Sequence, residues 1–258
     1  MKKVLTSVAL AAAALMVSVG AQAGVLRTTI DFETPIDGSP FLSYPGSPLL
    51  GNGDEFYQPG IAGRTMFFDP FSNSALAQPG DAVGLVVDPV SGPTYCGLFG
   101  MTCPANDPTT YLAALNDAAV VFGSTDGYRF SVKSLSASWV GNGDPLQATP
   151  GFVRLQGVRN GLSTTATFAL TGVDASGNLN FTTINTGAFG NTEFDYVYAY
   201  GFACPAPGGG TTCSSFSTDR AQFALDDITI EHVPEPASLA LLSVAGLAAF
   251  GARRRRAV

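Results

Sequence analysis

Short segments in which apolar and polar residues alternate recur along the middle of this chain, and they constrain its fold more than any other feature. Glycine, proline, asparagine and aspartate separate them at short intervals, and the chain has 30 Gly and 17 Pro. Alternation places every second side chain on one face of a strand, which is typical of strands with one buried face. We expect strands over residues 25–32, 64–68, 82–87, 118–122, 128–140, 151–158, 164–172, 179–184, 193–202 and 221–231.

Many short strands with turn residues between them predict an all-β fold, a jelly-roll-like β-sandwich. Residues 24–232 are long enough for one such domain with a sizeable core. Only residues 109–120 are expected to form a helical turn, residues 173–180 are expected to connect a hairpin, and residues 36–60 are expected to be an ordered loop. We also expect the first and last strands to pair, because pairing would protect both edges.

The N-terminus has the three parts of a secretory signal peptide. Lys2 and Lys3 precede the apolar run Val4–Val19, and Ala21-Gln22-Ala23 offers the small residues that signal peptidase cleaves after. Residues 1–23 are therefore expected to be removed, and the domain begins near residue 24.

The C-terminus carries a second apolar run, Ala237–Ala252, whose 16 residues have no charge. As a helix it would be about 24 Å long, somewhat shorter than the roughly 30 Å hydrocarbon core of a bilayer. The run is followed by Arg253, Arg254, Arg255 and Arg256, which the positive-inside rule keeps in the cytoplasm. The alternative is a buried core helix, but four consecutive arginines argue against burial. We expect a single transmembrane helix.

Directly before this run stand Val233, Pro234, Glu235 and Pro236, and the two prolines hold the chain extended. An extended motif, a short apolar helix and a basic cluster in this order resemble the PEP-CTERM sorting signal of Gram-negative bacteria, here residues 233–258. The resemblance implies that exosortase, a membrane-embedded cysteine protease-transpeptidase, removes the tail near the motif. It also implies a role beside exopolysaccharide or in a biofilm. The domain would be held at the inner membrane transiently, facing the periplasm, and then reach the cell surface or extracellular matrix.

Weaker resemblances concern the domain itself. The segment Gln222–Asp226 resembles the QFxxD subgroup of PEP-CTERM proteins, and residues 126–140 resemble the middle section of that subgroup. The "DFE" near the start and "LDDI" near the end resemble carbohydrate-binding jelly rolls and MAM-type domains. These resemblances imply a β-sandwich but no particular activity.

The charge of the domain narrows its partners. Six of the 13 basic residues and one of the 20 acidic residues lie in the two terminal signals, which leaves seven against 19 and a formal charge of −12. Such a surface repels nucleic acid and anionic lipid. Cations, neutral polysaccharide and other matrix components are compatible partners.

The four cysteines form two local pairs in loop-like sequence. Cys96 and Cys103 are seven residues apart, and Cys204 and Cys213 are nine apart. In an oxidising compartment we expect two disulfides that close loops. The alternative, a zinc site, would lack a nearby histidine.

Acidic residues near the two ends of the domain suggest a metal site. Asp31 and Glu33 lie two apart and so share one side of a strand. If the terminal strands are neighbours, Asp226 and Asp227 join them, and carboxylate oxygens are the ligands that calcium prefers. One structural Ca²⁺ held by these four residues is the hypothesis, and solvated charges at the strand ends are the simpler alternative.

Aromatic residues alternate along residues 193–202: Phe194, Tyr196, Tyr198, Tyr200 and Phe202 share one face. We expect this face to pack the core, because buried area dominates the energetics of aromatic side chains. The alternative is a platform on which sugar rings stack. Trp139 offers the same two alternatives, a sugar platform at the rim or a contact in the core.

Catalytic motifs are missing from the sequence. His232, the single histidine, lies next to the sorting motif, which argues against Ser-His-Asp and Cys-His sites. We therefore expect a non-enzymatic extracellular-matrix or surface protein. A carbohydrate-binding module is the first alternative. A polysaccharide-active hydrolase is the second, because a glycosidase needs only two carboxylates.

Overall fold

The structure is a computed structural model, and it describes residues 24–34, 49–73, 78, 81–90, 92–98, 100–141, 151–204, 212–216 and 220–232. Residues 27–232 form one compact unit. Residues 1–26 and 233–258 are grouped apart from it, and of these only 24–26 are described. Within the described ranges, no helix is both long and apolar enough to cross a membrane.

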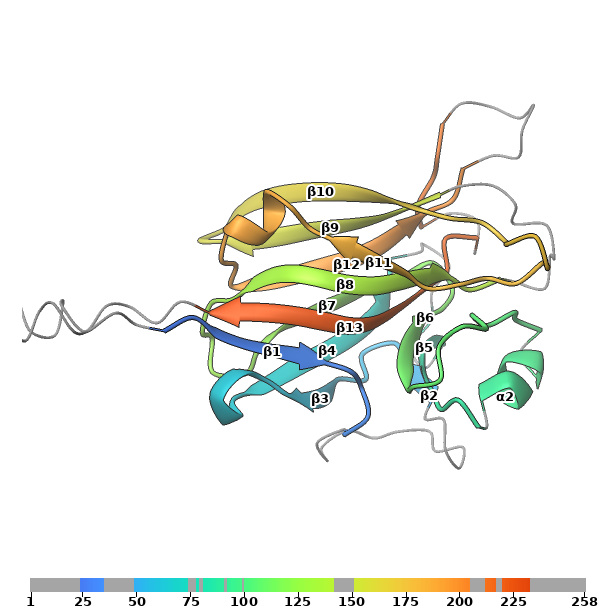
Figure 1. Ribbon diagram of the computed structural model, residues 1–258, viewed down its shortest axis with the longest axis horizontal. Helices are drawn as coiled ribbons and strands as arrows, with labels where there is room; N and C mark the ends of the chain where they lie inside the picture. Colours follow the sequence, from blue (N-terminus) through green and yellow to red (C-terminus); the bar gives the residue numbers. More distant parts are fainter. Residues whose placement is uncertain are drawn as a thin grey trace, which may run out of the picture. The chain divides into compact units, whose positions relative to one another are not determined.

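Two antiparallel sheets pack face to face as a sandwich (Figure 1). The seven-stranded sheet has the order β11-β8-β13-β6-β5-β2, with β1 also paired to β13. Its strands are β1 (Leu26–Ile30), β2 (Leu49–Gly51), β5 (Ala82–Val87), β6 (Tyr111–Ala114), β8 (Ser131–Trp139), β11 (Thr182–Asn185) and β13 (Phe223–His232). The six-stranded sheet has the order β10-β9-β12-β7-β4-β3. Its strands are β3 (Phe56–Pro59), β4 (Thr65–Ser72), β7 (Ala118–Ser124), β9 (Gly151–Arg159), β10 (Leu162–Leu170) and β12 (Tyr196–Phe202).

The predicted all-β sandwich is confirmed, whereas its jelly-roll topology stays a prediction. The helical turn expected over residues 109–120 is wrong, because this segment forms β6 and the start of β7, each paired on both sides. The described helix is α2 (Gly92–Leu98), and two short 3₁₀ turns, η1 (Ile61–Gly63) and η2 (Phe189–Asn191), occur between strands. Residues 36–60 also differ from the expected loop, since β2 and β3 lie within them.

Phenylalanine rings from both sheets fill the space between them. Phe68 stacks on Phe56 and Phe122, with ring centroids 5.4 and 5.3 Å apart. Phe32 meets Phe68 edge to face at 5.1 Å. All four rings are fully buried, and burial of such large apolar surfaces is the main source of stability in a sandwich of this kind.

The tight hairpin of the six-stranded sheet lies between β9 and β10 rather than at residues 173–180. Asn160 and Gly161 connect these strands with φ values of 51° and 76°, the backbone that a two-residue turn between twisted strands requires. Residues 173–180 instead link β10 to β11, which belong to different sheets. The expected hairpin there is therefore wrong, although Gly177 does have a positive φ of 81°.

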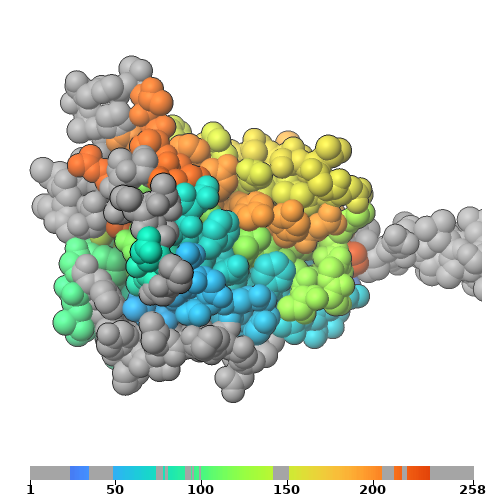
Figure 2. All heavy atoms as spheres, turned by 180° about the vertical axis from the view of Figure 1, so that it is seen from behind, coloured from blue at the N-terminus to red at the C-terminus, as the bar shows by residue number. Residues whose placement is uncertain are grey.

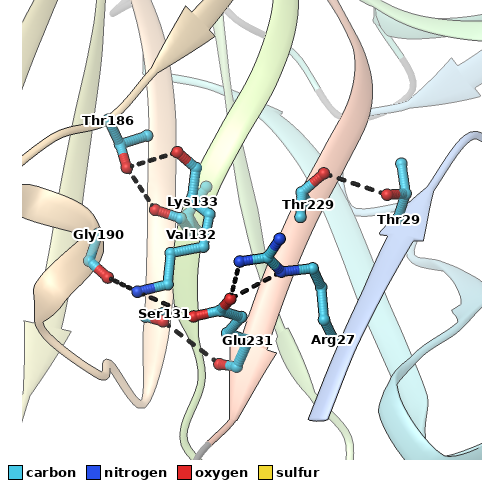
Figure 3. Close-up of polar contacts among 9 residues, drawn as sticks. All are labelled: Arg27, Thr29, Ser131, Val132, Lys133, Thr186, Gly190, Thr229 and Glu231. Carbon is cyan, nitrogen blue, oxygen red and sulfur yellow. Dashed lines mark hydrogen bonds and ion pairs between the residues drawn. The ribbon is translucent and has the colours of Figure 1, made fainter. Parts of the chain in front are cut away.

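The predicted pairing of the first and last strands is confirmed (Figure 3). The Thr29 and Thr229 hydroxyls lie 3.1 Å apart across β1 and β13. Arg27 donates its Nε to Glu231 Oε1 at 2.7 Å, and Lys133 Nζ lies 2.9 Å from Glu231 Oε2. Burial opposes ionisation of Glu231, but the hydrogen bonds from Lys133 and Arg27 outweigh it and lower the pKa of this carboxyl.

Candidate functional site

The aromatic residues of β12 face away from the core. Val197 and Ala199 are fully buried between the sheets, whereas Tyr196, Tyr198 and Tyr200 alternate with them and are half-buried. Because neighbouring side chains in a strand point to opposite faces, these tyrosines lie on the outer face of the six-stranded sheet. The expectation that the aromatic face packs the core is therefore wrong for β12.

Interior volume explains this orientation. Phe194 does enter the core, where it precedes β12 and packs on Phe189 with ring centroids 4.6 Å apart. A Cβ at Gly157, on the neighbouring strand β9, would lie 2.4 Å from the Phe194 ring, so the glycine provides the space for it. Because Phe194 already fills the interior beside β12, only small residues such as Val197 and Ala199 fit at the inward positions of this strand.

The outward tyrosines continue as rows across three strands. Tyr198 is in register with Val121 on β7, and Val121 with Asp69 on β4. Two rows flank this one. The first contains Phe67, Gly123 and Tyr196, and the second contains Phe71, Ala119 and Tyr200.

The small residues between the rings leave room for them. A Cβ at Gly123 would be 2.8 Å from the Phe67 ring and 3.2 Å from Tyr196 Cβ, so the two aromatic side chains approach each other across β7. We call the resulting surface the aromatic face and define it by Phe67, Phe71, Tyr196, Tyr198, Tyr200 and Phe202.

The rings of the aromatic face lie close to one another along β12. Tyr196 and Tyr198 have centroids 5.5 Å apart, and Tyr200 and Phe202 have centroids 5.6 Å apart. Phe71 meets Tyr198 edge to face at 6.1 Å. Figure 2 shows this side of the sheet, with β12 in orange between the yellow of β9 and β10 and the cyan and blue of β4 and β3.

Polar groups border the rings on the β9 side. The Tyr200 hydroxyl donates to Gln156 Oε1 at 3.1 Å. The Arg154 guanidinium lies 4.5 Å from the Phe202 ring centroid, a cation–π distance. These contacts hold two rings of the aromatic face in fixed positions.

Asp69 places a carboxyl group among the rings, between Phe67 and Phe71 on the same strand face. Its Oδ1 is buried and has no hydrogen-bond partner among the residues that the structure describes. Burial raises the pKa of Asp69 to about 6, and the charges of Glu55 and Asp54 add to the rise. A buried acceptor without a partner is costly, and a ligand hydroxyl would satisfy it.

Aromatic rings beside fixed carboxyl, amide and guanidinium groups are chemically suited to a sugar chain. The C–H faces of pyranose rings pack against aromatic rings, and their hydroxyls donate to and accept from such polar groups. Successive rings spaced along one strand offer contacts to successive sugars of an extended polysaccharide.

The predicted strand over 64–68 was too short to reveal the β4 part of the aromatic face, although the sequence pattern continues beyond it. The strand predicted over 64–68 in fact runs to Ser72, through Asp69 and Pro70. Proline is tolerated in β4 because β3 pairs with this strand only from Thr65 to Phe68. From Asp69 onward β4 is an edge strand on that side. The spacing of Phe67, Asp69 and Phe71 would have placed all three on one face.

Trp139 lies in the core rather than at the rim. Its side chain is 2% exposed at the end of β8, beside Gly151, where a Cβ would collide with the indole. The core alternative is therefore confirmed, and Trp139 presents no ring face to a sugar.

The four acidic residues expected to bind calcium do not gather at one point. Glu33 accepts from the Thr110 backbone at 2.6 Å and so ties the end of β1 to the start of β6. Asp226 is buried and Asp227 is exposed on β13. Among the described residues, no group of three or more His, Cys, Asp or Glu side chains is placed to hold a metal ion. Calcium binding stays a prediction.

Asp226 lies where the neighbour of β13 changes from β6 to β1. Its Oδ2 accepts from the Thr109 hydroxyl at 3.1 Å, and its Oδ1 has no hydrogen-bond partner within the described ranges. Burial raises the pKa of Asp226 to about 8, with a further contribution from the neighbouring Asp107. The folded protein therefore favours the protonated form of this carboxyl group at neutral pH.

Both predicted disulfides, Cys96–Cys103 and Cys204–Cys213, are present. The first joins Cys96 of α2 to the segment that follows the helix, beside a pocket of about 430 Å³ that Asp107 and Tyr111 help to line. The second joins the chain after β12 to the segment before β13. Two disulfides fit a protein that works outside the cytoplasm.

The predicted sorting residues, Val233 to Pro236 and Arg253 to Arg256, lie outside the described residues, as do the predicted signal peptide and the C-terminal apolar run. Comparison with known families shows that residues 232–256 match the PEP-CTERM protein-sorting motif. In a comparison with curated proteins, no protein matches this chain significantly.

Proposed function

We propose that this PEP-CTERM protein, an exosortase substrate that is exported or surface-associated, binds the extracellular polysaccharide of the cell that makes it. Binding uses the aromatic face and involves no catalysis. The sorting motif supports export, and the two disulfides fit an extracytoplasmic location. The polysaccharide role is the inference drawn here.

The outward orientation of Tyr196, Tyr198 and Tyr200 is the observation that carries this proposal. The interior beside β12 has no room for these rings, but a structural matrix protein without a binding site would have no use for rings on the outer face, where polar side chains expose less apolar surface to water. The sheet instead keeps small residues inside and half-exposes a row of rings. Partly exposed aromatic patches of this kind mark binding surfaces.

The charge of the domain indicates the class of polysaccharide. Seven basic against 19 acidic residues repel an anionic chain, so a neutral polysaccharide is the expected ligand. Asp69 then accepts a sugar hydroxyl, and Arg154 and Gln156 form the polar border of the binding face.

Two alternatives make different predictions. A structural matrix protein without a binding site would not distinguish one polysaccharide from another. A hydrolase is favoured by one observation, the raised pKa of Asp69 near the carboxyl group of Glu55, since a glycosidase uses a carboxylic acid with a raised pKa together with a second carboxyl group.

A single experiment separates these functions. The mature protein is applied to an array that includes the producer's own exopolysaccharide, and the same mixtures are assayed for released oligosaccharides. We expect selective binding without release, and loss of binding in Tyr198→Ala. The control is Leu98→Ala, which removes an exposed apolar side chain from α2 and should bind normally. Binding that survives Tyr198→Ala would contradict the site, and released oligosaccharides that disappear in Asp69→Asn would indicate the hydrolase.

A further inference from the structure

Strand ends and turns from both sheets meet at one end of the sandwich, which we call the His232 end (Figure 1). There β13 ends at His232, and its antiparallel neighbours β1 and β8 begin. In the other sheet, β12 begins and the β9–β10 turn lies at this same end.

Contacts tie these segments together. His232 Nδ1 lies 3.3 Å from Glu193 Oε1, and Lys133 Nζ donates to the Gly190 carbonyl at 2.7 Å. Arg129 pairs with Asp195 at 2.8 Å and donates to Asn160 of the β9–β10 turn at 2.6 Å.

The length of the linker to the predicted anchor limits the distance between the His232 end and a membrane. Only Val233 to Pro236 separate His232 from the apolar run that begins at Ala237. Even fully extended, four residues span about 14 Å. While the predicted anchor is in the bilayer, the His232 end must therefore lie near the headgroups.

The distribution of charge agrees with this placement. The His232 end holds five basic residues (Arg27, Arg64, Arg129, Lys133 and Arg159) and four acidic residues (Asp126, Glu193, Asp195 and Glu231), a formal charge of +1. The other described residues include two basic and 12 acidic ones, a formal charge of −10. An anionic lipid surface repels the acidic remainder of the domain, so an anchored domain is expected to turn its His232 end toward the lipid.

An exposed apolar side chain lies at the same end. Leu162, directly after the β9–β10 turn, is 77% exposed and is in register with Arg159. A leucine beside an arginine at a loop tip is suited to the interface of a bilayer, where the apolar group enters and the cation meets phosphate.

We propose that the anchored protein rests on the phospholipid surface through its His232 end, with Arg159 and Leu162 at headgroup level. The polysaccharide-binding rings of β12 then lie on a side of the sandwich and stay accessible. This inference rests on the export in the proposed function and on the predicted transmembrane anchor, but not on polysaccharide binding.

Depth-dependent fluorescence quenching tests the proposal. The full chain is reconstituted in vesicles of phosphatidylethanolamine and phosphatidylglycerol that carry brominated lipid near the headgroups. Leu162→Trp is compared with Leu98→Trp, whose parent residue is 71% exposed on α2, on the opposite side in Figure 1. The parent protein supplies the background from the buried Trp139.

We expect the bromolipid to quench the added tryptophan several-fold more strongly in Leu162→Trp than in Leu98→Trp. Adding Arg159→Glu to Leu162→Trp should reduce this quenching at low salt. Equal quenching at the two positions would overturn the proposal. Release of the full chain from vesicles by an alkaline wash would also overturn the proposal, because it would show that the chain has no membrane anchor. Neither result would affect polysaccharide binding by the mature protein.

Discussion

At the scale of single residues, the half-buried carboxyl group of Asp69 and the buried one of Asp226 have pKa values far above the ordinary value of an aspartate. Asp69 lies among the rings of the proposed binding face, and its Oδ1 lacks a hydrogen-bond partner among the described residues. Asp226 lies in the opposite sheet, where β13 changes neighbours, and its protonated form suits the adjacent Asp107. The first therefore matters for ligand binding, and the second for stability.

Polysaccharide binding should depend on pH through Asp69. Ionised Asp69 is the better acceptor for a sugar hydroxyl, and its pKa of about 6 places the transition between pH 5 and 7. We expect affinity to rise over this range and to be flat in Asp69→Asn, as measured by calorimetric titration. A wild-type affinity that does not change with pH would show that Asp69 takes no part.

Stability should depend on pH through Asp226. Its pKa is raised in the folded state, so the folded protein binds a proton that the unfolded chain releases, and stability falls as pH rises from about 4 to about 8. Asp226→Asn mimics the protonated acid and should flatten this decline. Above pH 8 we expect the variant to exceed the wild type by on the order of 1–3 kcal/mol in denaturant unfolding. A parallel decline in both proteins would rule out Asp226 as the source.

At the scale of elements, the alternating pattern predicted most strands, and β5 has the same bounds as predicted, Ala82–Val87. The pattern did not reveal which face of β12 is buried, because this depends on the volume that Phe194 and the rings of other strands occupy. Likewise, the pairing partners of β6 overrode a helix-like local sequence. The β1–β13 pairing was predictable because both segments are β-rich and carry polar groups that can meet across an edge.

The Glu231 cluster should hold β1 to β13. Glu231→Gln leaves Arg27 and Lys133 without their carboxylate, and the Glu231 side chain is only 10% exposed. We expect a loss of about 1–3 kcal/mol in the free energy of unfolding, measured with urea. Asp126→Asn is the matched control, because it breaks an ion pair with Arg64 in which the carboxyl group is 48% exposed, and it should cost clearly less stability than Glu231→Gln. Equal effects of the two substitutions would show that the cluster adds no more than a surface ion pair.

At the scale of the whole molecule, the C-terminal sorting motif and the sandwich before it differ in how far the sequence alone reveals them. The sequence identified the sorting signal without a structure, because its motif, apolar run and arginines are contiguous. For the aromatic face, the sequence indicated only the β12 rings, as an alternative to core packing, because the residues of β4 that complete the face lie more than 100 positions earlier. Only the fold brings them into the same rows.

Processing by exosortase should remove the tail. We expect intact-mass measurement to show that the mature protein from exporting cells lacks the apolar run and the four arginines. Its new C-terminus should lie near Pro234–Pro236. A strain without exosortase activity should retain the tail. A wild-type mature protein that still carries all four arginines would contradict this processing.

The most direct test of polysaccharide binding maps the contact itself. The mature protein, with labelled tyrosine and phenylalanine rings, is titrated with fragments of the producer's exopolysaccharide while ring chemical shifts are followed by nuclear magnetic resonance. We predict saturable shifts at Tyr196, Tyr198, Tyr200 and Phe71, and unchanged signals from core rings such as Phe68 and Phe122. Saturable shifts confined to other rings, or no shifts with any fragment, would contradict the account.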